Sequence, residues 1–325
     1  MACPCIEDVV DEEAVILCRE LHLRRERIVR PGVNFLTYPN DFIFERYRFS
    51  RQSKRPTLWR CRFHFLFLFF YISILIRPHI MNISDRGRAL TSEQILCVAL
   101  RFLANSCFLH NIGDAEHISK ATVCRAIRKV CLALKRFLQI FVVFPGHKPL
   151  RIIKEEFHRI PGFPNVVECI DGTHSPLHFQ KIICDAAHII TNVEAKWPGS
   201  IDGFLLGDRG YPCLTTLMTP YPEPEPGPQQ RFNVAHCWTR TRARVEMTIG
   251  LLKARFQCLR HLRVTPERAC NIIVACVFLH NIAIIRGEQH HDLQIRDPEE
   301  DPIHPADVQD GRVLRYIICH NAFSD

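Results

Sequence analysis

The chain has 325 residues, of which 47% are hydrophobic and 23% are charged, so a largely disordered protein is excluded and a sizeable core is expected. Its formal net charge is +8, and acidic residues gather in residues 7–13 and 289–310, which leaves the rest of the chain strongly positive. This distribution suits a polyanionic partner such as DNA, although a soluble basic protein without such a partner could have the same charge. The 16 cysteines include no C-x-x-C pair, which argues against a zinc ribbon. Because the chain is not small, opens without a signal peptide and has several cysteines in apolar surroundings, we expect a reducing compartment, the nucleus and also the cytoplasm.

The first predicted unit is an N-terminal segment, residues 1–82, with a weak helical pattern between Glu13 and Arg30. It contains an atypical apolar run at residues 63–76. This run is shorter than the roughly 20 residues needed to cross a bilayer, so no membrane partner is expected. A buried segment and a stretch foreign to the fold both remain open as interpretations.

The second predicted unit, residues 83–140, is helical and resembles a helix-turn-helix. The capping residue Thr91 begins one helix, a turn is expected at residues 111–114, and Ser119 begins a second helix with an apolar stripe. Polar and basic side chains fall broadly opposite that stripe, and such a helix can enter the major groove of DNA. The alternative is a solvated basic helix. The predicted DNA-binding residues are Lys120, Thr122, Arg125, Arg128 and Lys129.

The third predicted unit, residues 160–286, begins with short strands. One strand is expected at Val166–Ile170, ending at Asp171, and residues 182–193 have the pattern of two strands around a tight turn. A further strand, Phe204–Leu206, ends at Gly207 and Asp208. The later elements are a proline-rich loop at 220–228, a long helix from Val245 to Leu259, a helix over 267–285 and an acidic, disordered tail at 287–325.

Three acids carry the candidate chemistry. Asp171 and Asp208 each follow a strand-like run, and Glu246 lies on the long helix. Carboxylates from neighbouring strand ends and a packed helix can converge on divalent cations, for which hard oxygen ligands suit Mg²⁺ or Mn²⁺. Taken singly, each acid is weak evidence, because an Asp-Gly pair is usually a turn and a helical Glu usually faces water.

The sequence around these acids is more specific. Three blocks, Ile170–His174, Leu206–Pro212 with Met218–Tyr221, and Arg244–Phe256, are followed by His280-Asn281. In that order they resemble the DDE domain of PIF/Harbinger-type transposases, especially the vertebrate nucleases derived from them, over most of residues 80–310.

The resemblance implies an α/β, ribonuclease-H-like catalytic domain, preceded here by the helix-turn-helix-like region. It implies a divalent metal (Mg²⁺ or Mn²⁺), hydrolysis of DNA phosphodiester bonds, and Asp171, Asp208 and Glu246 as the catalytic and metal-binding residues. It also implies a Myb-like DNA-binding partner protein.

The chain departs from the family pattern by two shortenings, near residues 179–182 and between 200 and 201. A crossover between parallel strands needs about a dozen residues or more, and residues 199–203 cannot supply one. We therefore expect either a rewired sheet or an incomplete site. The preferred function is a metal-dependent DNA nuclease; the alternative is an inactive DNA-binding or protein-interacting transposase relic, or a truncated gene product.

Overall fold

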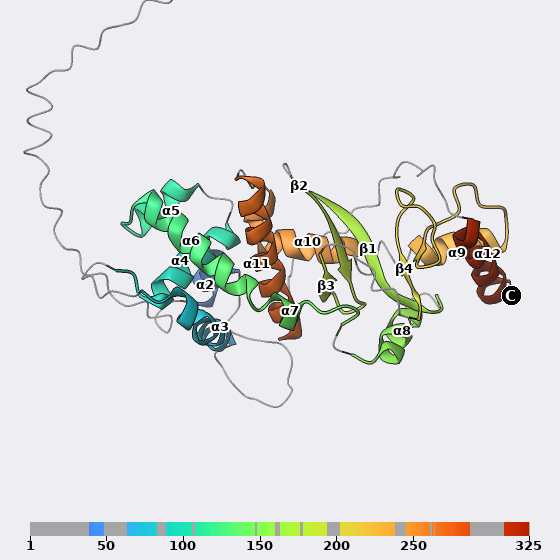
Figure 1. The fold of residues 1–325 in the computed structure, drawn as a ribbon, viewed down its shortest axis with the longest axis horizontal. Coiled ribbons are helices and arrows are strands. Elements are labelled where there is room, and N and C mark those ends of the chain that lie inside the picture. The colour runs from blue at the N-terminus through green and yellow to red at the C-terminus, as the bar shows by residue number, and fades with distance from the viewer. Residues whose placement is uncertain are drawn as a thin grey trace, which may run out of the picture.

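The computed structural model describes residues 39–48, 64–82, 89–105, 108–146, 148–159, 163–175, 178–193, 202–237, 245–260, 262, 264–286 and 309–324. A helical region and a mixed α/β region lie next to each other, with α11 between them (Figure 1). The helices before the sheet are α2 (Asn40–Tyr47), α3 (His64–Ile80), α4 (Ser92–Ala104), α5 (Leu109–Ala115), α6 (Lys120–Lys135), α7 (Leu138–Phe141) and α8 (Leu150–His158).

The sheet and the later helices follow. The strands are β1 (Val166–Ser175), β2 (His178–Cys184), β3 (Ile190–Asn192), β4 (Phe204–Leu206) and β5 (Leu217–Met218). The remaining helices are α9 (Pro228–Cys237), α10 (Val245–Arg255), the 3₁₀ helix η2 (Gln257–Arg260), α11 (Pro266–Ile285) and α12 (Gln309–Phe323).

Two predicted helix starts are confirmed. Thr91 Oγ1 accepts from the Gln94 N–H at 3.2 Å, and Gln94 Oε1 accepts from the Thr91 N–H at 3.0 Å, which forms a capping box before α4. Ser119 Oγ accepts from the Thr122 N–H at 3.2 Å and caps α6. Both helices therefore begin where their capping residues indicate.

The turn predicted at residues 111–114 is wrong, because these residues belong to α5. The chain turns later, where the Ile118 N–H bonds to the Gly113 carbonyl at 2.8 Å. A Cβ at Gly113 would lie 2.7 Å from the Ile118 carbonyl oxygen, so glycine permits this close return. The short helix α5 and the long helix α6 thus pack as neighbours with α4 beneath them.

The apolar run at 63–76 lies almost entirely within α3. Phe69, Ile72 and Ile76 are buried in the main core, whereas Phe70 and Ile74 are exposed. The buried interpretation therefore holds for one face of the helix.

The sheet has the order β3-β2-β1-β4-β5, with β2 antiparallel to β1 and β4 parallel to it. This mixed arrangement fits a ribonuclease-H-like fold. Residues 193–203 join β3 to β4, and the expectation of a rewired sheet is wrong, since β4 still lies directly beside β1. In the sheet order, β2 and β1 lie between β3 and β4, so the connection must cover three strand spacings, about 14 Å; an extended chain of this length, at about 3.3 Å per residue, can reach that far.

The tail predicted to be disordered contains a packed helix, α12, which corrects that expectation. Cys319 is fully buried, and a Cβ at Gly311 would lie 2.4 Å from the Cys213 carbonyl oxygen. Arg315 donates to the carbonyl oxygens of Thr219 at 3.2 Å and Pro220 at 3.1 Å. The acidic composition of residues 289–308, which lie outside the described ranges, obscured the amphipathic residues that follow them.

The helix α11 is long and apolar enough to cross a membrane by length and composition, but 67% of its apolar window is buried inside the fold. It packs against α6 on one side and α7 and α10 on others. Its hydropathy therefore matches that of a central core helix.

Candidate active site

Asp171 lies inside β1 and not at its end, which corrects the sequence expectation. The hairpin continues past it: Asp171 is opposite Ile182, and Ser175 is opposite His178. Pairing with β2 extends the strand beyond the Asp-Gly pair that was expected to stop it.

Asp208 follows β4, and its position corresponds in register to that of Asp171 on the parallel neighbouring strand β1. The register places Cys169 beside Leu206, so each aspartate lies two residues beyond a paired position. Adjacent parallel strands bring residues in matching positions side by side, so this register makes Asp171 and Asp208 neighbours at one edge of the sheet.

Gly207 shows which way Asp208 faces. A Cβ at Gly207 would lie 2.9 Å from Leu217 Cδ1 and 3.4 Å from Ile170 Cγ2, so this position points to the smaller hydrophobic cluster. Asp208 follows on the opposite side, is 9% exposed, and accepts from the Gly210 N–H through Oδ1 at 2.9 Å. The glycine therefore lets the chain approach β1 and turn the carboxylate to the other face.

The two faces of the sheet are distinguished by their clusters. Ile170, Leu205 and Leu217 belong to the smaller cluster, whereas Cys169 and Leu206 belong to the main core. Because side chains alternate along a strand, Asp171 shares the face of Cys169, which is the face that the main-core residues of α10 cover.

Glu246 lies in the first turn of α10 and is partly exposed. The helix packs against β1 and β2, so Glu246 is on the element expected to supply the third acid. Within the part of the chain that the structure describes, however, no three or more His, Cys, Asp or Glu side chains are grouped closely enough to hold a metal ion. The strand register aligns the positions of the two aspartates, but the described residues form no group of three acids.

Lys253 is a residue that the sequence analysis missed. Burial lowers the pKa of its ammonium group, Arg260 lowers it further, and Asp171 opposes the shift. Lys253 follows Glu246 by seven positions, which is two helical turns and the same helix face. That spacing was the available signal in the sequence, and the electrostatic effect of Asp171 on the pKa of Lys253 indicates that this cation lies near the first acid.

The carboxylates of Asp171 and Asp208 are ligands of the type that Mg²⁺ prefers, although they account for only part of its coordination. Mg²⁺ keeps several waters and is commonly bound through one or two carboxylates together with substrate phosphates. Asp171 and Asp208 would supply two hard oxygen ligands of this kind. Glu246 remains a predicted third ligand.

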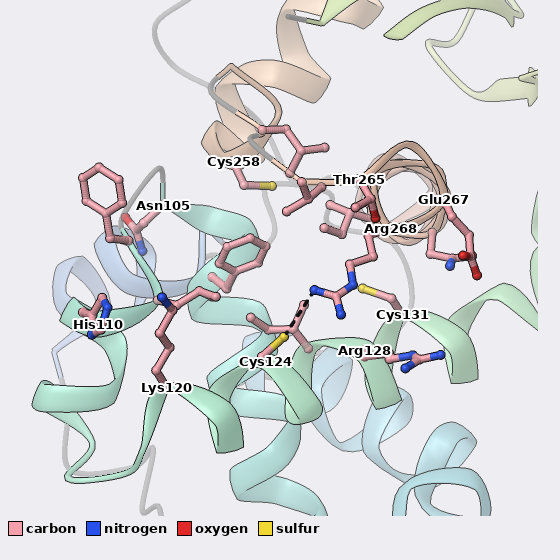
Figure 2. Close-up of a pocket in the computed structure, with 18 residues that line it drawn as sticks. Asn105, His110, Lys120, Cys124, Arg128, Cys131, Cys258, Thr265, Glu267 and Arg268 are labelled. Carbon is pink, nitrogen blue, oxygen red and sulfur yellow. Dashed lines mark hydrogen bonds between the residues drawn. The ribbon is translucent and has the colours of Figure 1, made fainter. Parts of the chain in front are cut away.

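The predicted DNA-binding residues divide between two sides of α6. Arg125 and Lys129 are exposed, with Lys129 Nζ donating to Asn82 Oδ1 at 3.2 Å, and Thr122 Oγ1 accepts from Arg125 at 3.3 Å. Lys120 and Arg128 instead line a cavity between α6 and the start of α11 (Figure 2). The basic face is therefore less uniform than the helical spacing predicted.

A second polar cluster lies toward the opposite end of β1. Glu168 is fully buried, and burial raises the pKa of its carboxyl group, with Asp185 raising it further and Thr191 opposing the shift. Asp185 Oδ1 accepts from the N–H groups of Ala187 and Ile189, both at 2.8 Å. These contacts hold the β2–β3 turn and explain the burial of Asp185, whereas the two carboxyl oxygens of Glu168 have no hydrogen-bond partner among the described residues.

Comparison with known proteins gives relatives over most of the chain. Residues 201–281 match the DDE superfamily endonuclease family. "Putative nuclease HARBI1" of Homo sapiens is 29% identical over 277 residues, 72% of this chain and 79% of that protein. Its counterpart in Xenopus laevis is 29% identical over 302 residues, 76% of this chain and 85% of that protein. No solved structure matches.

A plant relative, "Protein ALP1-like" of Arabidopsis thaliana, is 25% identical over 278 residues, 68% of each chain. Together these matches confirm the predicted resemblance to Harbinger-type DDE transposases and the nucleases derived from them. The matched family range contains Asp208 and Glu246 and begins after Asp171.

Proposed function

We propose that this chain, a relative of the Harbinger-derived nucleases, hydrolyses DNA phosphodiester bonds with the help of a divalent cation, Mg²⁺ or Mn²⁺. The observation that carries the proposal is the parallel register of β1 and β4, which makes Asp171 and Asp208 neighbours on the face covered by α10. Glu246 is the proposed third acid.

The residues of the site divide the work. Asp171 and Asp208 would hold the cation, whose chemistry, when it is bound, is to neutralise charge on the phosphate. The Gly210 N–H fixes one oxygen of Asp208, which preorganises that carboxylate. Lys253 adds a positive charge near Asp171 that favours a phosphate at this edge, and Glu246 would be the third ligand of the cation.

The rival function, an inactive DNA-binding relic, also has an observation in its favour. The described residues contain no closed group of three acids, and only residues 193–203 join β3 to β4. If the chain is such a relic, Asp171 and Asp208 are inherited from an active ancestor and have no catalytic role in this protein.

A nicking assay separates the two functions. Supercoiled DNA is incubated with purified full chain and Mg²⁺ or Mn²⁺, and wild type is compared with Asp208→Asn, which keeps an acceptor for the Gly210 N–H. We expect the variant to lose nicking by about a hundredfold or more, as for the removal of one preorganised catalytic group. The control is Asp202→Asn, an exposed acid paired with Lys154 at 2.9 Å.

Activity at the same level in the wild type and Asp208→Asn would identify a contaminant and favour the relic. The same would follow if nicking did not depend on the added cation.

We further propose that α5 and α6 form a helix-turn-helix that contacts DNA through Thr122, Arg125 and Lys129, with Lys120 and Arg128 at its border. A Myb-like partner protein and a nuclear, and also cytoplasmic, location belong to the same proposal. Imaging of the tagged chain and its co-precipitation with Myb-like proteins test the last two points.

A further inference from the structure

A groove of about 870 Å³ lies between the helical region and the start of α11. One wall is the face of α6 that carries Lys120, Cys124 and Arg128, and the opposite wall is formed by η2 and the first turns of α11 (Figure 2). The volume is that of a typical ligand site. The proposed nuclease function makes no use of this groove.

Three exposed cations follow the groove. Lys120 and Arg128 are eight residues apart on α6, which is about 12 Å along the helix axis. Arg268 lies between them and donates to Cys124 Sγ at 3.8 Å, as the dashed line in Figure 2 shows. Among the described residues, no carboxylate forms an ion pair with any of these three cations.

The floor of the groove is apolar. Phe102, Ile127, Leu262 and Ile272 contribute to its lining, and Glu267 is the one acid among the described lining residues. A ligand that pairs with the three cations and also covers the apolar floor must be amphipathic. It needs an apolar side and several negative charges about one helical turn apart.

The chain itself contains such a segment in residues 7–17. Its acids include Glu7, Asp8, Asp11 and Glu12, which recur at a spacing of four residues. Its apolar residues Val10, Ala14 and Leu17 have the spacing of one helix face. These residues lie outside the described ranges, and the five acids of residues 7–13 match the cations of the groove in sign.

The described chain begins close to the groove. Residue 39 leads into α2, where the Arg46 carbonyl accepts from Asn105 Nδ2 at 3.2 Å, and Asn105 lines the groove. Residues 18–38 can extend about 3.3 Å each, which is more than enough to bring residues 7–17 back to α6.

We propose that the groove between α6 and α11 is the binding site of the chain's own acidic segment, residues 7–17. The acids of the segment pair with Lys120, Arg128 and Arg268, and its apolar face covers Phe102 and Ile127. Because Lys120 and Arg128 also border the proposed DNA-binding surface, a docked segment would screen them from DNA.

Thiol alkylation tests the docking without DNA or catalysis, so its outcome is independent of the nuclease proposal. Cys124 lines the groove and is half-buried, whereas Cys237 is exposed on α9 and serves as an internal control. The full chain is treated briefly with iodoacetamide, and alkylation at each cysteine is followed by peptide mass spectrometry. In the wild type, Cys124 is expected to react slowly.

The decisive variant removes the five negative charges of the segment: Glu7→Gln, Asp8→Asn, Asp11→Asn, Glu12→Gln and Glu13→Gln. We expect Cys124 to react several-fold faster in this variant, with Cys237 unchanged. Arg128→Gln, on the groove side, should accelerate Cys124 in the same direction.

A matched control neutralises five acids of the other acidic end, namely Asp292, Asp297, Glu299, Glu300 and Asp301. It should leave the rate at Cys124 unchanged. A synthetic peptide of residues 6–17, which has no cysteine to consume iodoacetamide, should restore slow reaction when it is added to the five-site variant.

Equal rates at Cys124 in the wild type and the five-site variant would overturn the proposal. A peptide without protective effect would do so too, as would acceleration by the control that equals that of the variant.

Discussion

The side-chain amide of Asn281 bonds to the backbone of Ile190 in both directions. Its Oδ1 accepts from the Ile190 N–H at 2.9 Å, and its Nδ2 donates to the Ile190 carbonyl at 2.6 Å. Nδ2 also donates to the Phe141 carbonyl at 2.9 Å. Ile190 begins the edge strand β3, so Asn281 satisfies two groups that a further strand would otherwise bond.

This relationship predicts that Asn281→Asp is strongly destabilising. The substitution replaces a donor that serves two carbonyls with an acceptor in a fully buried position, and unsatisfied buried groups cost about 1–3 kcal/mol each. Urea unfolding should show a loss of about 2–4 kcal/mol. Asn271→Asp on the same helix is the control, because the side-chain oxygen of Asn271 accepts from Lys135 and an aspartate can still do so. A similar loss in both variants would contradict the explanation.

The packing of α12 predicts that Gly311→Ala is destabilising. A Cβ there would lie 2.4 Å from the Cys213 carbonyl oxygen and 2.8 Å from Leu214 Cα, and backbone atoms cannot give way as a flexible side chain can. Overpacking of this kind costs about 1–3 kcal/mol, measurable by thermal or urea unfolding. Val313→Ala, at an exposed position of α12, should change stability little. If Gly311→Ala were neutral, α12 would not be docked on this loop.

The burial of Glu168 predicts a pH dependence of stability. Burial raises the pKa of Glu168 in the folded chain above its unfolded value, so its contribution is fully present below the unfolded pKa and is lost as pH rises toward the folded pKa. Glu168→Gln mimics the protonated form, so its stability relative to wild type should increase between pH 4 and pH 8.

Urea unfolding at several pH values measures this difference. Glu155→Gln, an exposed position on α8 paired with Arg151, should show no comparable trend. A pH-independent difference between Glu168→Gln and wild type would mean that the carboxyl group is ionised in the fold.

The exposed face of α6 predicts a specific effect on DNA binding. Arg125→Ala should weaken binding to duplex DNA and reduce the slope of log affinity against log salt by about 1, as expected for one lost phosphate contact. Fluorescence anisotropy at several salt concentrations gives both values. Arg151→Ala on α8 removes the same charge from an exposed position away from α6, and an equal loss there would indicate only a general charge effect.

The sequence predicted the elements whose local signals agree with their packing. Thr91 and Ser119 carry capping chemistry that the structure uses directly, and the run Phe204–Leu206 before Gly207 is a strand. These predictions succeeded because hydrogen bonds to the nearest residues, or a short apolar run, determine the element.

The failures arose where distant contacts decide the structure. β1 continues past Asp171 because β2 pairs with it, and α12 forms against residues around 213–221, about a hundred positions away. Lys253 was missed because its role depends on the face that α10 turns to β1. The register that makes Asp171 and Asp208 neighbours is likewise a property of the assembled sheet.

The helix α11 has a practical consequence for dissecting this protein. It packs on α6 and on α10, and residues of the helical region and of the sheet belong to one continuous hydrophobic cluster. A fragment ending near residue 140 would leave the α11-facing side of α6 open to water, and a fragment starting near residue 160 would do the same for α11. Neither half should be soluble when expressed alone, and co-expression of the two halves should recover a folded complex.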